Sequence, residues 1–181
     1  MKATHYVKIF LFGLAFVCVF ACKTSQTTMI IGDSFDEKTN KTTLTLFPYG
    51  NIILQGKWIK TRYNENSRQH FFTNKDSTTL VVTKNPKEKY SFYKPDQNDK
   101  MFVTDFFKWD SEYWEKQGLN ISTLLDSSDR GYIIWQATKT NVHDTFLFGS
   151  KNGFAYNFMA TSKILSLENK IELLKEIYSN N

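Results

Sequence analysis

The hydrophobic pattern of this chain changes period along its length, and this succession limits the folds that the chain can adopt. From Thr42 onward, apolar and polar residues alternate in short segments such as Thr43-Leu44-Thr45-Leu46-Phe47, which is typical of half-buried strands. Turn residues such as Pro48-Tyr49-Gly50-Asn51 separate these segments. The pattern predicts a first antiparallel meander with strands at residues 43–47, 52–54, 58–63, 69–72 and 79–83.

The middle and the end of the chain have a helical period. Apolar residues at positions 102, 103, 106, 107, 109, 113 and 114 share one broad helical face, which predicts a helix over residues 99–117 that ends before Gly118. Further strands are predicted at residues 120–125, 132–138, 145–149 and 154–160, and Asn152-Gly153 is a strong hairpin signal. A last helix is predicted to begin after Ser166, which can cap it.

The order of these elements predicts the fold class. Two helices cannot enclose two sheets of three or four strands, but they can cover one sheet. We therefore expect an α+β fold in which a single curved antiparallel β-sheet, made of two meanders, is covered by the mid-chain amphipathic helix and the C-terminal helix. This globular domain is predicted to span residues 42–181.

The first 22 residues are similar to the lipobox signal of bacterial lipoproteins. Ile9 to Phe20 form an apolar run that is too short to span a bilayer, and Ala21 precedes Cys22. The resemblance implies cleavage between Ala21 and Cys22 and acylation of Cys22, so that residues 1–21 are a lipoprotein signal peptide. Residues 22–41 are then expected to be the lipidated cysteine and a flexible tether.

The composition agrees with export to the cell envelope. Cys18 would leave with the signal and Cys22 would carry lipid, so no thiol would remain for a disulfide or a metal. Loss of Lys2 and Lys8 lowers Lys+Arg from 23 to 21 against 18 Asp+Glu, a net charge of +3, and no basic run points to nucleic acid. The absence of an acidic residue directly after Cys22 favours the periplasmic face of the outer membrane.

The succession of strands around Pro48 and Gly56-Lys57-Trp58, a mid-chain amphipathic helix, two late hairpins and a closing helix resembles the Mog1/PsbP/DcrB group over most of residues 42–179. The resemblance implies an α/β/α sandwich and a non-enzymatic accessory protein. It includes no diagnostic motif, so it carries no functional residue over to this chain.

The sequence gives little sign of catalysis or of a metal. Gly32-Asp33-Ser34 is similar to the first block of SGNH hydrolases, but the downstream Asp-x-x-His block is missing. His70 and His143 lack the spacing of metal ligands and are interpreted as strand-surface or turn residues. We therefore predict no catalytic residue, no metal site and no cofactor.

Asp110 lies at the centre of the apolar face of the predicted central helix, and two interpretations stay open. A partly buried carboxylate there would contact a ligand or a partner, together with the neighbouring Trp109 and Trp114. Alternatively, Asp110 caps a second short helix over residues 111–117, and the aromatic residues are core residues; this interpretation is the simpler one.

We therefore expect a membrane-anchored periplasmic lipoprotein that acts, without catalysis, as a binding or assembly factor for another envelope protein. Its partners would be the lipid bilayer, through acylated Cys22, and that envelope protein. The alternative is a carrier of a small apolar ligand such as a lipid, which requires an enclosed aromatic cavity. An SGNH-like hydrolase is a remote third possibility.

Overall fold

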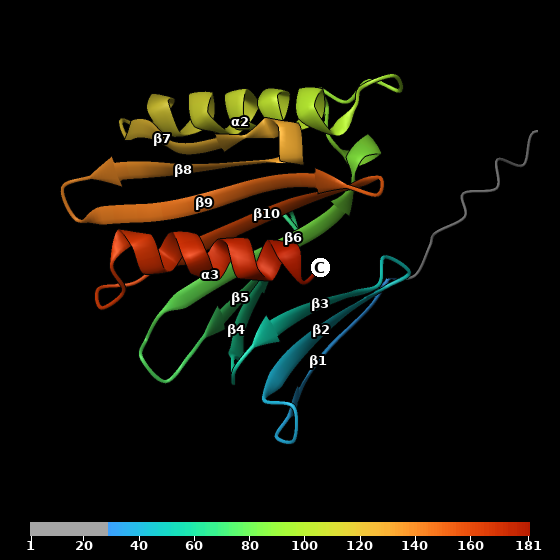
Figure 1. Cartoon of the computed structure of the whole chain (residues 1–181), viewed down its shortest axis with the longest axis vertical. Helices are drawn as coiled ribbons and strands as arrows, with labels where there is room; N and C mark the ends of the chain where they lie inside the picture. The colour runs from blue at the N-terminus through green and yellow to red at the C-terminus, as the bar shows by residue number, and fades with distance from the viewer. Residues whose placement is uncertain (1–28) are drawn as a thin grey trace, which may run out of the picture.

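A computed structural model describes residues 29–181, and these residues form a three-stranded and a seven-stranded antiparallel sheet with two α-helices (Figure 1). The strands are β1 (Ile30–Asp36), β2 (Lys41–Phe47), β3 (Asn51–Gln55), β4 (Ile59–Asn64), β5 (Gln69–Thr73), β6 (Thr79–Pro86), β7 (Asn120–Ser127), β8 (Tyr132–Lys139), β9 (Val142–Lys151) and β10 (Phe154–Thr161). The helices are α2 (Asp99–Lys116) and α3 (Leu167–Ser179), with short 3-10 turns η2 (Lys87–Lys89) and η3 (Ser128–Arg130).

The seven-stranded sheet separates two layers. Its strand order is β4-β5-β6-β10-β9-β8-β7, and helix α2 packs on one face, mainly against β7, β8 and β9. Helix α3 and the three-stranded sheet, ordered β1-β2-β3, lie on the other face (Figure 1). The α+β class and the antiparallel pairing predicted from the sequence are therefore confirmed.

Each face of the seven-stranded sheet has its own hydrophobic core, because successive side chains of a strand point to opposite faces. On β8, for example, Ile134 joins the core under α3 whereas Trp135 joins the core under α2. The α2 core consists of Phe102, Val103, Phe106, Ile133, Trp135, Ala137, Phe146, Phe148 and Ala155. The α3 core also includes Leu44, Leu46, Ile52 and Leu54 from the three-stranded sheet.

The prediction of a single sheet is wrong, because the first three strands form a sheet of their own. The chain leaves that sheet at Gly56, and the Thr42 hydroxyl fixes the corner: it donates to the Gly56 carbonyl at 2.8 Å and accepts from the Trp58 amide at 2.9 Å. The small sheet then covers the large one by burying its own apolar face. A helix is thus not needed over that region.

The predicted tether is also too long. Ile30–Asp36 is strand β1, which pairs with β2 over its whole length from Ile30↔Phe47 to Asp36↔Lys41. Because β1 is an edge strand with mostly exposed or half-exposed side chains, its sequence is polar and reads as a linker. Residues 22–28 lie outside the described residues, as does the predicted signal peptide.

Local sequence signals predicted both helices and the last hairpin well. The side chain of Asn98 caps α2 by accepting from the Met101 amide at 2.9 Å, and Ser166 caps α3, as expected, by accepting from the Asn169 amide at 3.2 Å. Asn152 and Gly153 both have positive φ and join β9 to β10, which confirms the predicted hairpin.

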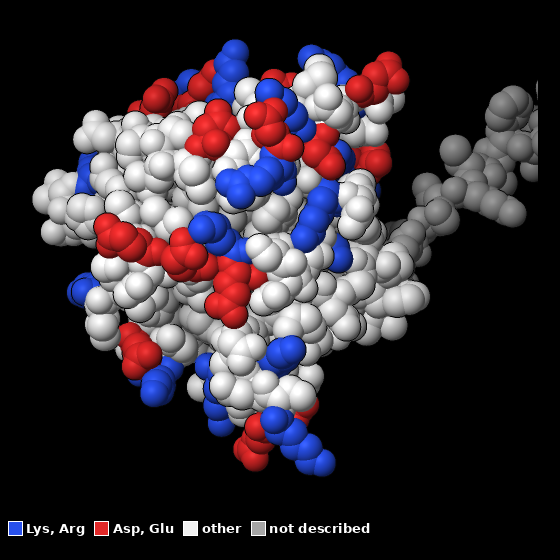
Figure 2. Space-filling view, in the orientation of Figure 1, with Lys and Arg blue, Asp and Glu red and all other residues white. Residues whose placement is uncertain are grey.

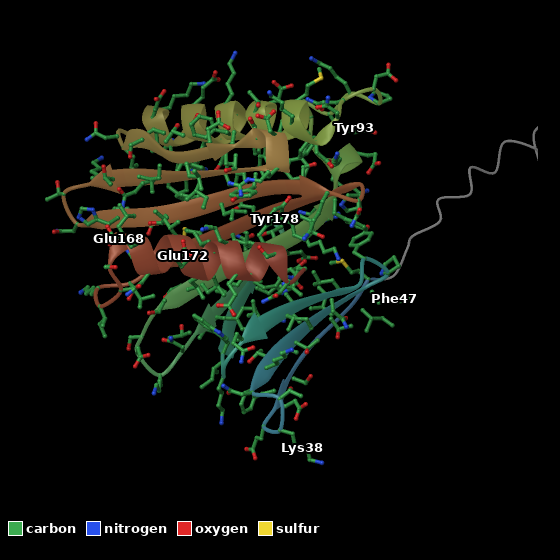
Figure 3. All side chains as sticks on the ribbon, in the orientation of Figure 1. Lys38, Phe47, Tyr93, Glu168, Glu172 and Tyr178 are labelled. Atoms are coloured by element: carbon green, nitrogen blue, oxygen red, sulfur yellow. The ribbon has the colours of Figure 1, made fainter. Side chains whose placement is uncertain are left out.

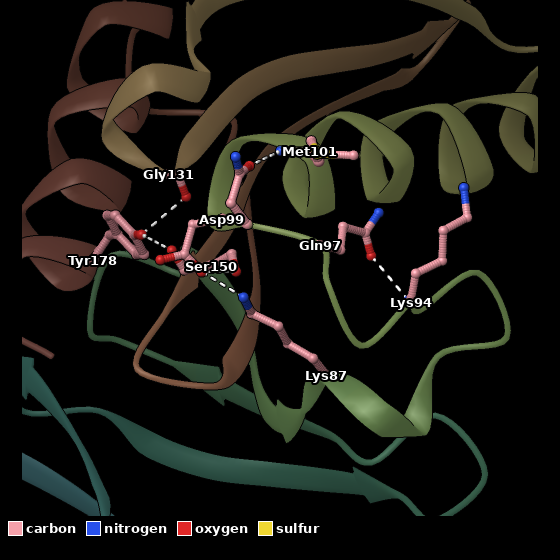
Figure 4. Close-up of polar contacts among 9 residues, drawn as sticks. Lys87, Lys94, Gln97, Asp99, Met101, Gly131, Ser150 and Tyr178 are labelled. Carbon is pink, nitrogen blue, oxygen red and sulfur yellow. Dashed lines mark hydrogen bonds and ion pairs between the residues drawn. The ribbon is translucent and has the colours of Figure 1, made fainter.

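A polar network ties the start of α2 to the large sheet and to η2 (Figure 4). The Asp99 carboxylate accepts from Lys87 Nζ at 2.5 Å and from Ser150 Oγ at 2.6 Å, and both donors are buried. Next to it, the Tyr178 hydroxyl of α3 lies 2.9 Å from the Gly131 carbonyl and 3.1 Å from the Ser150 carbonyl. Figure 3 shows Tyr178 directed from α3 toward the large sheet. The network holds both helices against the same corner of the sheet.

Candidate functional site

A groove lies between α2 and the part of the large sheet that α2 does not cover. Helix α2 packs over β7–β9, whereas the same face of β4, β5, β6 and β10 borders a cleft of about 800 Å³, which adjoins a second one of about 420 Å³. The residues that line both clefts are Ser67, Gln69, Trp109, Asp110 and Asn157. We treat the two clefts as one groove and call it the α2 groove.

Aromatic side chains of α2 form one wall of the α2 groove. Trp109 and Tyr113 are one helical turn apart and about half exposed, at 49% and 55%. The Trp109 ring packs against Tyr90 and Phe92, with ring centroids 6.2 and 5.7 Å apart, so its position is fixed on one side while the other side stays open. Exposed aromatic rings held in this way are typical of interaction sites.

Asp110 lies inside α2 and not at a helix start. The helix runs unbroken from Asp99 to Lys116 with Asn98 as its cap, so the interpretation of Asp110 as a cap is wrong. Its Oδ2 accepts a hydrogen bond from Trp114 Nε1 at 3.1 Å. Burial raises the pKa of the Asp110 carboxyl to about 6, and the hydrogen bond from Trp114 limits this rise.

The floor of the α2 groove holds two unsatisfied polar groups. Thr83 of β6 and Asn157 of β10 are paired in register, and both side chains point to the α2 side of the sheet. Thr83 is 2% exposed, and within residues 29–181 neither Thr83 Oγ1 nor Asn157 Oδ1 has a hydrogen-bond partner. Leaving such a group unpaired costs stability, about 1–3 kcal/mol each.

The structure brings the three predicted contact residues together. Trp109 and Asp110 line both clefts of the groove and Trp114 lines the larger one; a role for them in binding stays a prediction. Sequence reasoning missed Thr83 and Asn157, which come from strands far apart in the chain. One signal could have found them: in each strand, the alternation of residues places a polar side chain on a face where an apolar one is expected.

The other predicted sites have different outcomes. Ala21 and Cys22, the predicted cleavage and lipidation residues, lie outside the described residues. Between residues 29 and 181, no three His, Cys, Asp or Glu side chains come together as a metal site would require. In that same part of the chain, neither α2 nor α3 is both long and apolar enough to cross a membrane.

The serine of the hydrolase-like tripeptide lacks the geometry of a nucleophile. Gly32-Asp33-Ser34 lies within β1 and not in a turn after a strand, and β1 is far from the β8–β9 hairpin that carries His143 (Figure 1). Among the described residues no hydrogen bond joins Ser34 to His143 or to His70. His143 is exposed beside a turn, as predicted, but His70 is buried in β5, so the prediction of a surface position is wrong for His70.

His70 makes the stability of the fold sensitive to acid. Burial, with the nearby Lys60 charge, lowers the pKa of His70 from 6.5 to about 4. Between these values the unfolded chain binds a proton that the folded chain does not, so stability falls as the pH falls below about 6.5. We expect this residue to lower the free energy of unfolding by about 2 kcal/mol from pH 7 to pH 5.

Urea denaturation of the wild type and of His70→Phe at both pH values measures this contribution. Asp110 acts in the opposite direction, because its raised pKa favours the folded state as the pH falls through 6, but it is present in both proteins and cancels in the comparison. An equal pH dependence in the two proteins would contradict the role of His70.

No family model matches this sequence, and no curated protein matches it significantly. The structure is similar to the solution structure of the cyanobacterial PsbP protein from Synechocystis sp. PCC 6803, with 11% sequence identity and a TM-score of 0.45. The match covers 89% of this chain and 96% of that chain. At this level of identity no functional residue transfers from that protein to this one.

Proposed function

We propose that this protein is a lipid-anchored protein of the bacterial envelope that binds another envelope protein, without catalysis, through the α2 groove. The observation that carries the proposal is that half-exposed Trp109 and Tyr113 line the same groove as polar groups that have no hydrogen-bond partner among the described residues. Acylation at Cys22 would hold the domain at the membrane, and the periplasmic face of the outer membrane is the proposed location.

The shape of the α2 groove supports a protein partner over an apolar ligand. A lipid carrier needs an enclosed apolar cavity, whereas this groove is only partly enclosed and is lined by charged residues such as Arg62 and Glu112. Positive and negative side chains are also interspersed over the face seen in Figure 2. No field of one sign therefore covers the face that carries α3.

The test is native mass spectrometry of the protein purified gently in detergent from its own envelope. We expect a stoichiometric protein partner that remains bound when Cys22→Ala produces a soluble exported form. The double variant Trp109→Ala/Tyr113→Ala is expected to lose the partner, because exposed aromatic residues at the centre of an interface contribute most of its binding energy.

The matched control is Ile164→Ala, which removes an exposed apolar side chain, 71% exposed, outside the groove. It should retain the partner. A partner that survives the double variant as well as the control would refute the groove as the binding site. A small molecule released on unfolding, with no protein partner, would favour the carrier.

A further inference from the structure

We propose that the α2 groove binds a cationic side chain, lysine or arginine, of the partner protein at the Asp110 carboxylate. The inference deepens the proposed function by naming the chemistry of the partner and rests on the groove being the binding site. Three features of the described residues carry it: an unpaired carboxylate, a floor of oxygen atoms without donors, and aromatic rings beside them.

The first feature is the absence of a cation at Asp110. Trp114 Nε1 is the only hydrogen-bond donor to this carboxylate within residues 29–181, and none of the four ion pairs in that range involves it. Burial of a carboxylate without a cationic partner is unfavourable. A guanidinium or ammonium group in the groove would supply the missing charge and donors.

The second feature is the chemistry of the floor. Asn157 Oδ1 can only accept hydrogen bonds, and Thr83 Oγ1 can accept or donate one; both oxygens are buried and unpaired, and both residues line the groove beside Asp110. Arginine and lysine side chains carry several donors and no acceptor, which matches this set. A carboxylate or phosphate ligand would instead meet the Asp110 carboxylate, a charge of the same sign.

The third feature is the aromatic wall. Trp109 and Tyr113 flank Asp110 on α2, and their rings are half exposed. A cation over the face of a tryptophan or tyrosine ring is stabilised by cation–π attraction. The same chain shows such a contact within the groove, where the Arg62 guanidinium lies 3.9 Å from the centroid of the Phe71 ring.

The groove also contains positive side chains, and their positions agree with the proposal. Arg62, Lys89 and Lys116 are exposed, so solvent and salt screen their repulsion. Arg68 is half-buried and lines the smaller cleft, but neither it nor the other three lies within 4.0 Å of the Asp110 carboxylate. They leave the carboxylate free.

The probe is the tripeptide acetyl-Gly-Arg-Gly-amide, titrated into the full-length Cys22→Ala protein while the NMR signals of the tryptophan indole N–H groups are recorded. We expect saturable shifts of Trp109 and Trp114. The citrulline tripeptide, which has a similar shape without charge, should bind at least about tenfold more weakly, because its N–H groups form only neutral-donor hydrogen bonds to the carboxylate and no ion pair.

The matched variants are Asp110→Asn and Glu115→Gln. Each removes one negative charge from α2, but Glu115 is exposed and lies outside the groove. Asp110→Asn should weaken arginine binding at least about tenfold and leave citrulline binding unchanged, whereas Glu115→Gln should change neither. Equal affinity for the arginine and citrulline peptides, or full affinity in Asp110→Asn, would overturn the proposal.

Two further outcomes are decisive. If the free amine agmatine binds as tightly as the peptide, the site is a small-amine site and the assignment to a partner side chain is wrong. If the arginine peptide binds as expected but the envelope yields no partner, the proposed function fails while the cation site stands. If an envelope partner binds Asp110→Asn as tightly as the wild type, the proposed function stands while the cation site fails.

Discussion

Replacing Gly149 by alanine is expected to lower the free energy of unfolding by about 3 kcal/mol, because a β-carbon there has no room. It would lie 2.3 Å from Cε2, 2.8 Å from Cδ2 and 2.9 Å from Cζ of Tyr178. The ring cannot move aside cheaply, since it is buried and its hydroxyl is held by the Gly131 and Ser150 carbonyls. Chemical denaturation measures the loss.

Gly32→Ala is the matched control, because Gly32 also lies in a strand but its β-carbon would meet no atom within 4 Å. It should leave stability unchanged or raise it slightly, by about 0.5 kcal/mol. Replacing the Tyr178 ring by the smaller leucine side chain should remove most of the loss of stability caused by Gly149→Ala, as measured in a double-mutant cycle. A cost that stays the same without the ring would show that contact with Tyr178 is not its cause.

Replacing Asp99 by alanine is the second large change, with an expected loss of about 3 kcal/mol. The substitution leaves buried Lys87 without its counter-charge and buried Ser150 without its acceptor. It also detaches the first turn of α2 from the sheet (Figure 4). Because α2 forms one wall of the groove, we expect the variant to bind its partner more weakly as well. Denaturation and the partner assay measure the two effects.

An exposed ion pair provides the contrast for Asp99. Asp129 pairs with Lys100 at 2.7 Å, a distance similar to that in the Asp99–Lys87 pair. The side chains of Asp129 and Lys100 are 83% and 57% exposed, whereas those of Asp99 and Lys87 are 44% and 9% exposed, so only the second pair has a buried cation. Asp129→Ala should therefore cost less than about 1 kcal/mol. Similar losses in the two variants would contradict the assignment of the Asp99 effect to burial.

The sequence predicts the elements of this fold because their signals are local. Ser166 caps a helix through an amide three residues away, and Asn152-Gly153 turns the chain within two residues. The division into two sheets depends instead on contacts between separate segments. The Thr42 hydroxyl holds the corner after β3 from 14 residues away, and no periodicity of β2 reveals that contact.

The candidate site is predictable only in part for the same reason. Trp109, Asp110 and Trp114 lie on one helix, so their common placement follows from the helical period. Thr83 and Asn157 meet only because β6 pairs with β10, two strands separated by the whole of α2, β7, β8 and β9. Helix α2 also lies to one side of the sheet, so it does not cover β4, β5, β6 and β10, and the groove forms over these strands.

The incorporation of residues 30–36 into strand β1 changes how far the domain can travel from a membrane. If lipid is attached at Cys22, only seven residues, 23–29, separate the anchor from the paired strand, a span of at most about 30 Å, where a tether through residue 41 would allow about 70 Å. The domain would then search a thin layer next to the bilayer. Confinement of this kind raises the effective concentration of the domain near a partner in the same membrane. A weak contact in the groove would then suffice for stable association there.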